Sequence, residues 1–223
     1  MAIKIMAHRC GDYFGPENSK QALLKTLKYK PDIIEIDVRK SSDGVLFCYH
    51  GNILEVLFSR FYFNKPFKRL QEKYRSLVTL REIVKIIGNK CEIYLDIKDS
   101  RINDKDLKNV FKGIKTKQVY IGSALFSFIE KIKVPKKWKK VVVGVIDFKI
   151  NIERVKKANI RMVQLFKWNS TKKNLEKLRK NSVEFALASW FLKPKNFTKK
   201  AIEKKSTWVW DYNILNLKKR LKK

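Results

Sequence analysis

The two histidines of this chain, His8 and His50, both lie in the first fifty residues, among acidic residues spaced to act together. Glu35 and Asp37 lie between them, two positions apart, and Arg9 directly follows the first histidine. Imidazoles can move protons near neutral pH, because the ordinary histidine pKa is about 6.5. Paired carboxylates can hold a hard cation, and arginine suits bidentate contact with phosphate. Together these residue types could cleave a phosphate ester with the help of a metal.

The two acids lie in an apolar segment, Ile33-Ile34-Glu35-Ile36-Asp37-Val38, which is typical of a buried strand. Side chains two positions apart on a strand point to the same face, so both carboxylates can converge on one point. Placing two acids in so apolar a strand is costly unless a metal or a partner compensates.

Strand-like runs alternate with helical patterns along the whole chain, which predicts a parallel sheet. The predicted strands are 3–7, 32–38, 91–97, 118–122, 140–146, 161–166, 183–188 and 207–211. The predicted helices are 19–29, 79–87, 104–114, 125–132, 152–158, 171–180, 196–204 and 214–221. Eight such units favour an α/β fold of the (β/α)₈ TIM barrel type, in one domain over residues 1–223. The alternative is a doubly wound open sheet, although no G-x-G-x-x-G follows the first strand.

A barrel would bring the candidate residues together, because its active site lies at the carboxyl ends of the strands. His8 and Arg9 follow the first predicted strand, and Glu35 and Asp37 lie near the end of the second. Asp96 lies near the end of the third and could supply another carboxylate. Lys98, two positions further on the same side, would join Arg9 as a phosphate-binding group.

Residues 41–76 interrupt the alternation. Asp43-Gly44 is a hairpin signal, so we expect 45–50 to fold back on the second strand as a short antiparallel extension. Residues 51–76 then form an insertion rich in aromatic and basic residues. This insertion could be a lid that contacts an anionic membrane, or a cap that packs on the barrel mouth.

The net charge of +31 is concentrated outside the candidate site. The first 50 residues carry eight basic and six acidic residues, whereas the other 173 carry 44 and 15. Such a surface attracts phosphates, anionic lipids or nucleic acid, but it also suits a well-solvated lysine-rich exterior. We expect no specific nucleic-acid partner, and the oligomeric state is left open.

Cellular location is predicted from the N-terminal segment and the cysteines. The first seven residues contain no long apolar region of the signal-peptide kind. Three cysteines without a paired spacing suit free thiols in a reducing compartment. The sequence therefore predicts a cytoplasmic protein.

Several segments resemble, in order, the signature of the glycerophosphodiester phosphodiesterase family, within the phospholipase C-like phosphodiesterase superfamily. The family pattern reads A-H-R-G, P-E-N-T, E-x-D-V, D-G and H-D, followed by P-T-L-E-E and I-E-x-K. The matching segments here are Ala7-His8-Arg9, Pro16-Glu17-Asn18, Ile34-Glu35-Ile36-Asp37-Val38, Asp43-Gly44, His50, Thr79-Leu80-Arg81-Glu82 and Leu95-Asp96-Ile97-Lys98.

This resemblance implies a TIM barrel that hydrolyses glycerophosphodiesters to glycerol 3-phosphate and an alcohol, using Mg²⁺ or Ca²⁺. By position, it implies that His8 and His50 are the acid–base pair, with His8 as the base and His50 as the acid. It makes Glu35, Asp37 and Asp96 the metal ligands, and Arg9 and Lys98 the phosphate contacts. The implied partner is a small-molecule phosphodiester.

The chain departs from the family pattern at three of these positions. Cys10 stands where the family has glycine, Gly51 follows His50 in place of aspartate, and Asp96 replaces glutamate. An aspartate-x-lysine pair is also seen in related sphingomyelinase D-like phospholipases. A second hypothesis is therefore a phospholipase D-like enzyme acting on lysophospholipid or sphingolipid. A third is a noncatalytic polyanion-binding protein that uses the basic surface.

Overall fold

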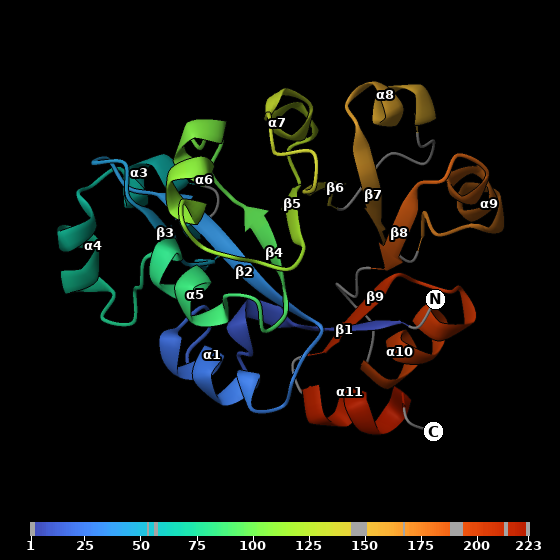
Figure 1. Ribbon diagram of the computed structural model, residues 1–223, viewed down its shortest axis with the longest axis horizontal. Helices are drawn as coiled ribbons and strands as arrows, with labels where there is room; N and C mark the ends of the chain where they lie inside the picture. Colours follow the sequence, from blue (N-terminus) through green and yellow to red (C-terminus); the bar gives the residue numbers. More distant parts are fainter. Residues whose placement is uncertain are drawn as a thin grey trace.

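Parallel strands alternate with helices around a barrel in the computed structural model (Figure 1). The structure describes residues 3–52, 54–55, 58–143, 151–166, 168–187, 194–211 and 214–221. The parallel strands are β1 (Lys4–Ala7), β2 (Ile33–Lys40), β4 (Glu92–Ile97), β5 (Val119–Ser123), β6 (Lys139–Val142), β7 (Ile160–Leu165), β8 (Glu184–Leu187) and β9 (Trp208–Asp211). Each lies where a strand was predicted, although the predicted ends of β6, beyond 143, and of β8, at 188, lie outside the described residues.

The order of the strands distinguishes a barrel from an open sheet. It runs β8-β7-β6-β5-β4-β2-β1-β9, so the last strand pairs in parallel with the first. A backbone hydrogen bond from Thr207 N to Phe185 O, 2.9 Å long, then joins the start of β9 to β8. The strands therefore form a nearly closed barrel, as predicted, and the doubly wound alternative is wrong.

A helix follows each of these strands. The helices are α1 (Lys20–Leu27), α5 (Leu80–Ile87), α6 (Asp104–Phe111), α7 (Phe126–Lys131), α8 (Ile152–Lys157), α9 (Lys172–Lys180), α10 (Pro194–Glu203) and α11 (Ile214–Leu221). Polar residues fix several starts: the Ser19 hydroxyl accepts from Ala22 N, and Thr79 forms a capping box with Glu82. Within the described residues, no helix is long and apolar enough to span a membrane.

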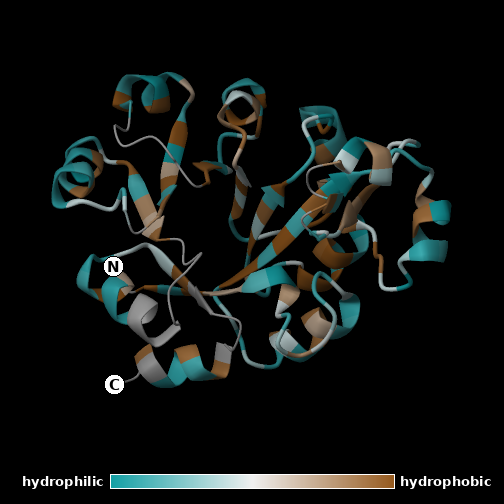
Figure 2. Ribbon diagram, turned by 180° about the vertical axis from the view of Figure 1, so that it is seen from behind, coloured by the Kyte–Doolittle hydropathy of each residue, from teal (hydrophilic) through white to brown (hydrophobic). Residues whose placement is uncertain are grey.

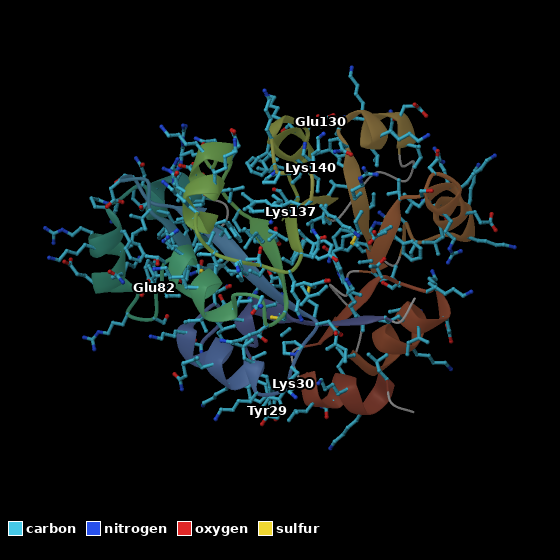
Figure 3. The ribbon with its side chains drawn as sticks, in the orientation of Figure 1. Tyr29, Lys30, Glu82, Glu130, Lys137 and Lys140 are labelled. Carbon is cyan, nitrogen blue, oxygen red and sulfur yellow. The ribbon has the colours of Figure 1, made fainter. Side chains whose placement is uncertain are left out.

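Apolar side chains pack in two layers. Inside the barrel lie large side chains such as Tyr94, Tyr120 and Trp208, all buried. A larger cluster fills the space between the strands and the surrounding helices. Figure 2 shows hydrophobic residues on the strands and hydrophilic residues on the outward side of the helices. Nitrogen-tipped side chains project around the outline in Figure 3, which fits the basic composition.

The predicted hairpin and insertion lie at one end of the barrel. Strand β3 (Leu46–Cys48) pairs antiparallel with the end of β2, as predicted. The insertion forms α3 (Ser59–Phe63) and α4 (Phe67–Lys73), although residues 53, 56 and 57 lie outside the described residues. Phe63 and Leu70 are buried against Phe47 of β3. Part of the insertion is therefore a packed cap.

Candidate active site

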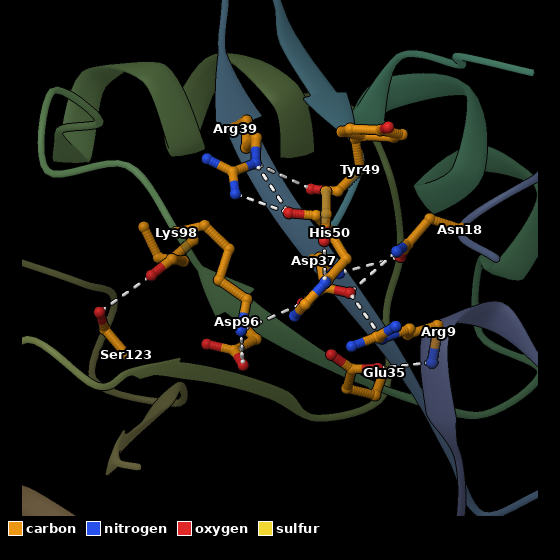
Figure 4. Close-up of polar contacts among 12 residues, drawn as sticks. Arg9, Asn18, Glu35, Asp37, Arg39, Tyr49, His50, Asp96, Lys98 and Ser123 are labelled. Carbon is orange, nitrogen blue, oxygen red and sulfur yellow. Dashed lines mark hydrogen bonds and ion pairs between the residues drawn. The ribbon is translucent and has the colours of Figure 1, made fainter. Parts of the chain in front are cut away.

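Three carboxylates meet at the carboxyl ends of β2 and β4. Glu35 and Asp37 point to the same side of β2, and Asp96 on β4 lies in register with Asp37. Each of the three offers an oxygen, and these oxygens lie within 4.8 Å of one another. Figure 4 shows them at the centre of a polar network. Since Glu35 and Asp37 are only 3% and 1% exposed, the cluster is a buried acidic centre.

The surroundings act differently on the two acids of β2. Burial raises the pKa of Glu35 well above its usual value, and the neighbouring Asp37 and Asp96 raise it further. Burial would also raise the pKa of Asp37, but Lys98, His50 and Arg9 outweigh this effect and lower it. The surroundings therefore stabilise the charged form of Asp37 and destabilise the charged form of Glu35.

Lys98 follows β4 and bridges two of the three carboxylates. Its Nζ lies 2.6 Å from Asp96 Oδ2 and 3.2 Å from Asp37 Oδ1. Burial works against its charge, but Asp96 and Asp37 outweigh burial and raise the pKa of the ammonium. A positive charge is thus held at the acidic centre.

The turn after β1 brings Arg9 and Asn18 to the same centre. The backbone N–H of Arg9 donates to Glu35 Oε2 over 2.5 Å, and Arg9 Nε lies 3.4 Å from Asp37 Oδ2. A further guanidinium nitrogen of Arg9 contacts Glu17. Asn18 donates from Nδ2 to Asp37 Oδ2 over 2.8 Å and accepts the Asp37 N–H at 3.0 Å. These contacts fix both acids of β2.

This turn stays tight although Cys10 stands where glycine was expected. Arg9, Cys10 and Gly11 have φ values of 47°, 63° and 90°, so all three are left-handed. A Cβ on Gly11 would lie 1.8 Å from Thr26 Oγ1, so this position requires glycine. Gly11 N donates to His8 O over 2.7 Å and closes the turn. The glycine requirement lies one residue later than the pattern indicates, and Cys10 is buried and free.

His8 begins the short 3₁₀ turn His8–Cys10 that follows β1. Its Nδ1 lies 3.2 Å from Asp12 Oδ2. Both side chains are mostly buried, and His8 is close enough to Asp37 to help lower the pKa of that acid. A carboxylate at Nδ1 fixes the orientation of the ring.

His50 follows β3 and lies beside Asp37 (Figure 4). Its Nδ1 lies 2.7 Å from Gly51 O, so Nε2 is the nitrogen that this contact leaves uncommitted. Burial lowers the pKa of His50, and Arg9 and Lys98 add to this effect, while Asp37 opposes it. Both histidines thus lie close enough to Asp37 to lower its pKa.

Arg39 supports His50 through the backbone. This buried side chain donates from Nε to Tyr49 O and His50 O, each over 3.2 Å, and from Nη2 to His50 O over 2.6 Å. Its guanidinium carbon lies 4.5 Å from the centre of the Phe63 ring. Arg39 therefore links β2, the second histidine and the insertion.

Glu55 completes the loop beyond His50. Its carboxylate accepts from Tyr74 OH over 2.5 Å, from Tyr49 OH over 3.1 Å and from Asn52 N over 2.9 Å. Burial would raise the pKa of Glu55, but these hydrogen bonds, that of Tyr74 first, outweigh it and lower the pKa. The loop carrying the second histidine is thus fixed by a buried carboxylate.

All seven residues selected from the sequence lie at this end of the barrel, and the three carboxylates, Arg9 and Lys98 make direct contacts there. Three supporting residues were missed. Arg39 shares the face of Glu35 and Asp37 by its spacing, which could have revealed it. Asp12 lies four positions after His8, which is a weaker signal. No feature of the sequence pointed to Glu55.

A family model matches most of the chain. The model of the glycerophosphoryl diester phosphodiesterase family matches residues 8–200. The chain belongs to this family. It is therefore a glycerophosphodiester phosphodiesterase, and the noncatalytic polyanion-binding hypothesis is set aside.

Solved structures show the same fold at low sequence identity. A phosphodiesterase from Oleispira antarctica, solved with the product sn-glycerol-3-phosphate, is 14% identical with a TM-score of 0.82 and covers 100% of this chain and 98% of its own. A glycerophosphodiester phosphodiesterase from Thermotoga maritima is 20% identical, with a TM-score of 0.76 and 98% of each chain covered. One from Parabacteroides distasonis is 14% identical, with a TM-score of 0.77, over 99% and 97% of the chains.

Proposed function

We propose that this enzyme hydrolyses glycerophosphodiesters to glycerol 3-phosphate and an alcohol in a metal-dependent reaction, within one domain over residues 1–223. The observation that carries this proposal is the group formed by the buried Glu35 and Asp37 with the half-buried Asp96, which Lys98 and Arg9 contact. The product held by the Oleispira antarctica structure agrees with this choice of substrate.

The donor set fits a divalent cation. Three carboxylate oxygens within 4.8 Å are ligands that Mg²⁺ or Ca²⁺ would accept. Burial raises the pKa of Glu35, and Asp37 and Asp96 raise it further; a bound cation would favour the charged form against both effects. We therefore assign Glu35, Asp37 and Asp96 as its ligands. When bound, the cation would polarise the phosphoryl oxygens and offset charge that develops on them.

Metal dependence can be tested with a turnover panel. Glycerophosphocholine, glycerophosphoethanolamine and glycerophosphoinositol are each assayed with Mg²⁺, with Ca²⁺ and with a chelator. We expect turnover of at least one substrate that the chelator abolishes, and a loss of more than about 100-fold in Glu35→Gln. Glu92→Gln is the matched control, because Glu92 lies at the opposite end of β4 and pairs with Lys4. Activity that survives full chelation contradicts the metal assignment.

We assign Lys98 and Arg9 as phosphate-binding groups and the two histidines as the proton carriers. The contact of His8 Nδ1 with Asp12 orients the imidazole ring, so we assign His8 as the base that takes the proton of the nucleophile. His50 is then the acid that protonates the leaving alkoxide through Nε2. Its lowered pKa makes the imidazolium a stronger acid.

A substrate with a good leaving group separates these roles. The alkoxide of choline needs a proton as it leaves, whereas p-nitrophenolate does not. We expect His50→Ala to lose about 100- to 1,000-fold with glycerophosphocholine, but to recover most of its rate with glycerophospho-p-nitrophenol. His8→Ala should lose its activity with both substrates. Equal losses of His50→Ala with the two substrates contradict its role as the acid.

The nucleophile is water or the 2-hydroxyl of the substrate glycerol. We favour the hydroxyl, because a group held in the same molecule has a large effective concentration. This route forms a cyclic phosphate first, which phosphorus NMR of early product would detect. It also predicts no turnover of a substrate that lacks the 2-hydroxyl. A linear product at all times contradicts it.

Membrane contact and cytoplasmic location remain proposals. The described part of the insertion exposes Phe58 and Phe61, at 59% and 80%, beside Arg60. Aromatic and basic side chains together favour the surface of an anionic bilayer. Co-sedimentation with liposomes should depend on anionic lipid, and binding to neutral liposomes alone contradicts this mode of contact. Cell fractionation would test the location.

A further inference from the structure

A cleft of about 1170 Å³ opens directly beside the catalytic centre. His50, Arg39 and Lys98 lie along it, so the cleft is continuous with the proposed phosphate position. Phe58 and Phe61 of the insertion also line it, as does Leu125 at the start of α7. Pockets that enclose a drug-sized ligand hold roughly 300–1,000 Å³. The space therefore exceeds what a glycerophosphoryl group with a small alcohol needs.

The apolar lining of the cleft is exposed and well positioned. Phe58, Phe61 and Leu125 are 59%, 80% and 48% exposed, whereas Phe63 of the same helix is buried in the cap. The Ser123 hydroxyl accepts from Leu125 N over 3.1 Å and donates to Ile97 O over 2.9 Å, which fixes that wall. Large apolar side chains gathered beside a reactive site mark a place for an apolar ligand.

The charges around the cleft narrow the choice of ligand. Arg39, Arg60, Lys98 and Arg101 all line it. The carboxylate among the lining residues is Asp99, and Arg101 Nη2 holds it at 2.7 Å. A quaternary ammonium such as choline could stack on the phenylalanines, but these cations would repel it. A neutral hydrocarbon chain attached to a phosphate fits both the apolar wall and the charges.

We propose that the cleft binds the acyl chain of a single-chain glycerophospholipid, so that lysophospholipids are the preferred substrates. This inference rests on the proposed function and names the substrate class of the same site. The net reaction is the same hydrolysis: an oxygen from water bonds to phosphorus, and the bond from phosphorus to the alcohol oxygen breaks. The leaving oxygen takes the proton, so the products are monoacylglycerol phosphate and the free alcohol.

Chain length is the first test. Choline release is measured from glycerophosphocholine and from lysophosphatidylcholines with 6-, 8- and 10-carbon chains, all below the concentration at which micelles form. Each fully buried methylene strengthens binding about fourfold, and each half-buried methylene about twofold. The six methylenes of an octanoyl chain should then raise kcat/KM roughly 60-fold. A kcat/KM that is flat or falls with chain length overturns the proposal.

Substitutions in the cleft provide the second test. Phe58→Ser combined with Phe61→Ser should lower the ratio of kcat/KM for the octanoyl substrate to that for glycerophosphocholine by about tenfold or more. Both side chains are exposed, so the fold should tolerate the change. Leu24→Ser on α1 is the matched control, because Leu24 is 47% exposed outside the cleft and the ratio should not move.

A binding measurement separates this inference from the proposed function. Calorimetry gives the Kd of alkylphosphocholines with 6, 8 and 10 carbons for the wild-type protein and the double variant. A Kd that falls with chain length in the wild type, and less steeply in the variant, supports the chain site even if no diester is hydrolysed. A Kd independent of chain length overturns it, while turnover of glycerophosphocholine would still uphold the proposed function.

Discussion

Glu35→Gln should make the metal-free protein more stable while abolishing its response to metal. In the absence of a cation, Glu35 faces two other carboxylates whose ligand oxygens lie within 4.8 Å. Two unit charges at this distance repel by about 3 to 4 kcal/mol at an effective dielectric constant near 20. Lys98 and Arg9 offset part of this repulsion, yet the pKa of Glu35 stays raised, so a net penalty remains.

Glutamine removes the charge and keeps the contact that positions the side chain. Its amide oxygen can still accept the Arg9 N–H that now donates to Glu35 Oε2. We expect the free energy of unfolding of the variant at pH 7.5 with chelator to exceed that of wild type by about 1–3 kcal/mol. For a chain of this length, this corresponds to a Tm higher by about 2–12 °C.

Metal should reverse this order. A cation at 100 times its Kd would stabilise the wild type by about 2.7 kcal/mol, or roughly 5–10 °C in Tm. The variant should show little of this shift. Thermal unfolding with chelator and with Mg²⁺ or Ca²⁺ gives all four values. Glu92→Gln is the control: it loses an ion pair with Lys4, so it should be slightly less stable than wild type with an unchanged metal shift.

Two outcomes would refute this reasoning. A variant less stable than wild type in chelator would mean that the charge of Glu35 is compensated without a cation. An undiminished metal shift in the variant would mean that the cation binds elsewhere.

Three further substitutions probe the parts that support the site. Arg39→Lys keeps the charge but loses the paired donation to His50 O, so kcat should fall about 10- to 30-fold at similar KM in steady-state kinetics; an unchanged kcat contradicts the positioning role. Glu55→Gln should cost stability at pH 7, because the hydrogen bonds that lower the pKa of Glu55 stabilise the fold fully above the ordinary carboxyl pKa of about 4.3 and progressively less as the pH falls through the lowered value. Urea unfolding at pH 7, 4 and 3 measures this difference, and a difference that does not narrow toward pH 3 contradicts the reasoning. Gly11→Ala should lower the unfolding free energy by about 2–4 kcal/mol, because its Cβ would meet a threonine hydroxyl. Gly44→Ala, at φ 85° in open space, should cost only about 1 kcal/mol. Equal losses of Tm would mean that the cost comes from the backbone conformation and not from the contact with threonine.

The barrel and the acidic centre were predictable because both follow from local rules. Parallel strands buried on both faces appear as short apolar runs, and the eight predicted runs match eight strands. Alternation of side chains along β2 then places Glu35 and Asp37 on one face. The register that sets Asp96 beside Asp37 follows from the parallel pairing of β2 with β4.

The insertion could not be resolved from the sequence, because its aromatic residues serve two purposes. Phe63 and Leu70 cover Phe47 of the hairpin, so they form a cap. Phe58 and Phe61 lie on the same short segment but stay exposed in the cleft. Composition alone cannot assign these residues, since the division depends on which side of α3 faces β3.

The departure at Gly51 also becomes interpretable only in three dimensions. The family pattern has aspartate after the second histidine, yet here φ at Gly51 is 90°, and a Cβ would lie 3.3 Å from Glu55 Oε2 and 3.5 Å from Arg39 Nη2. A carboxylate at position 51 would therefore crowd the one that Glu55 already places there. The hydroxyls of Tyr49 and Tyr74 donate hydrogen bonds to the Glu55 carboxylate, so its charge is stabilised without an ion pair to a cation. Glycine at position 51 and glutamate at position 55 thus depend on each other, and together they leave Arg39 free to hold the carbonyl of the second histidine.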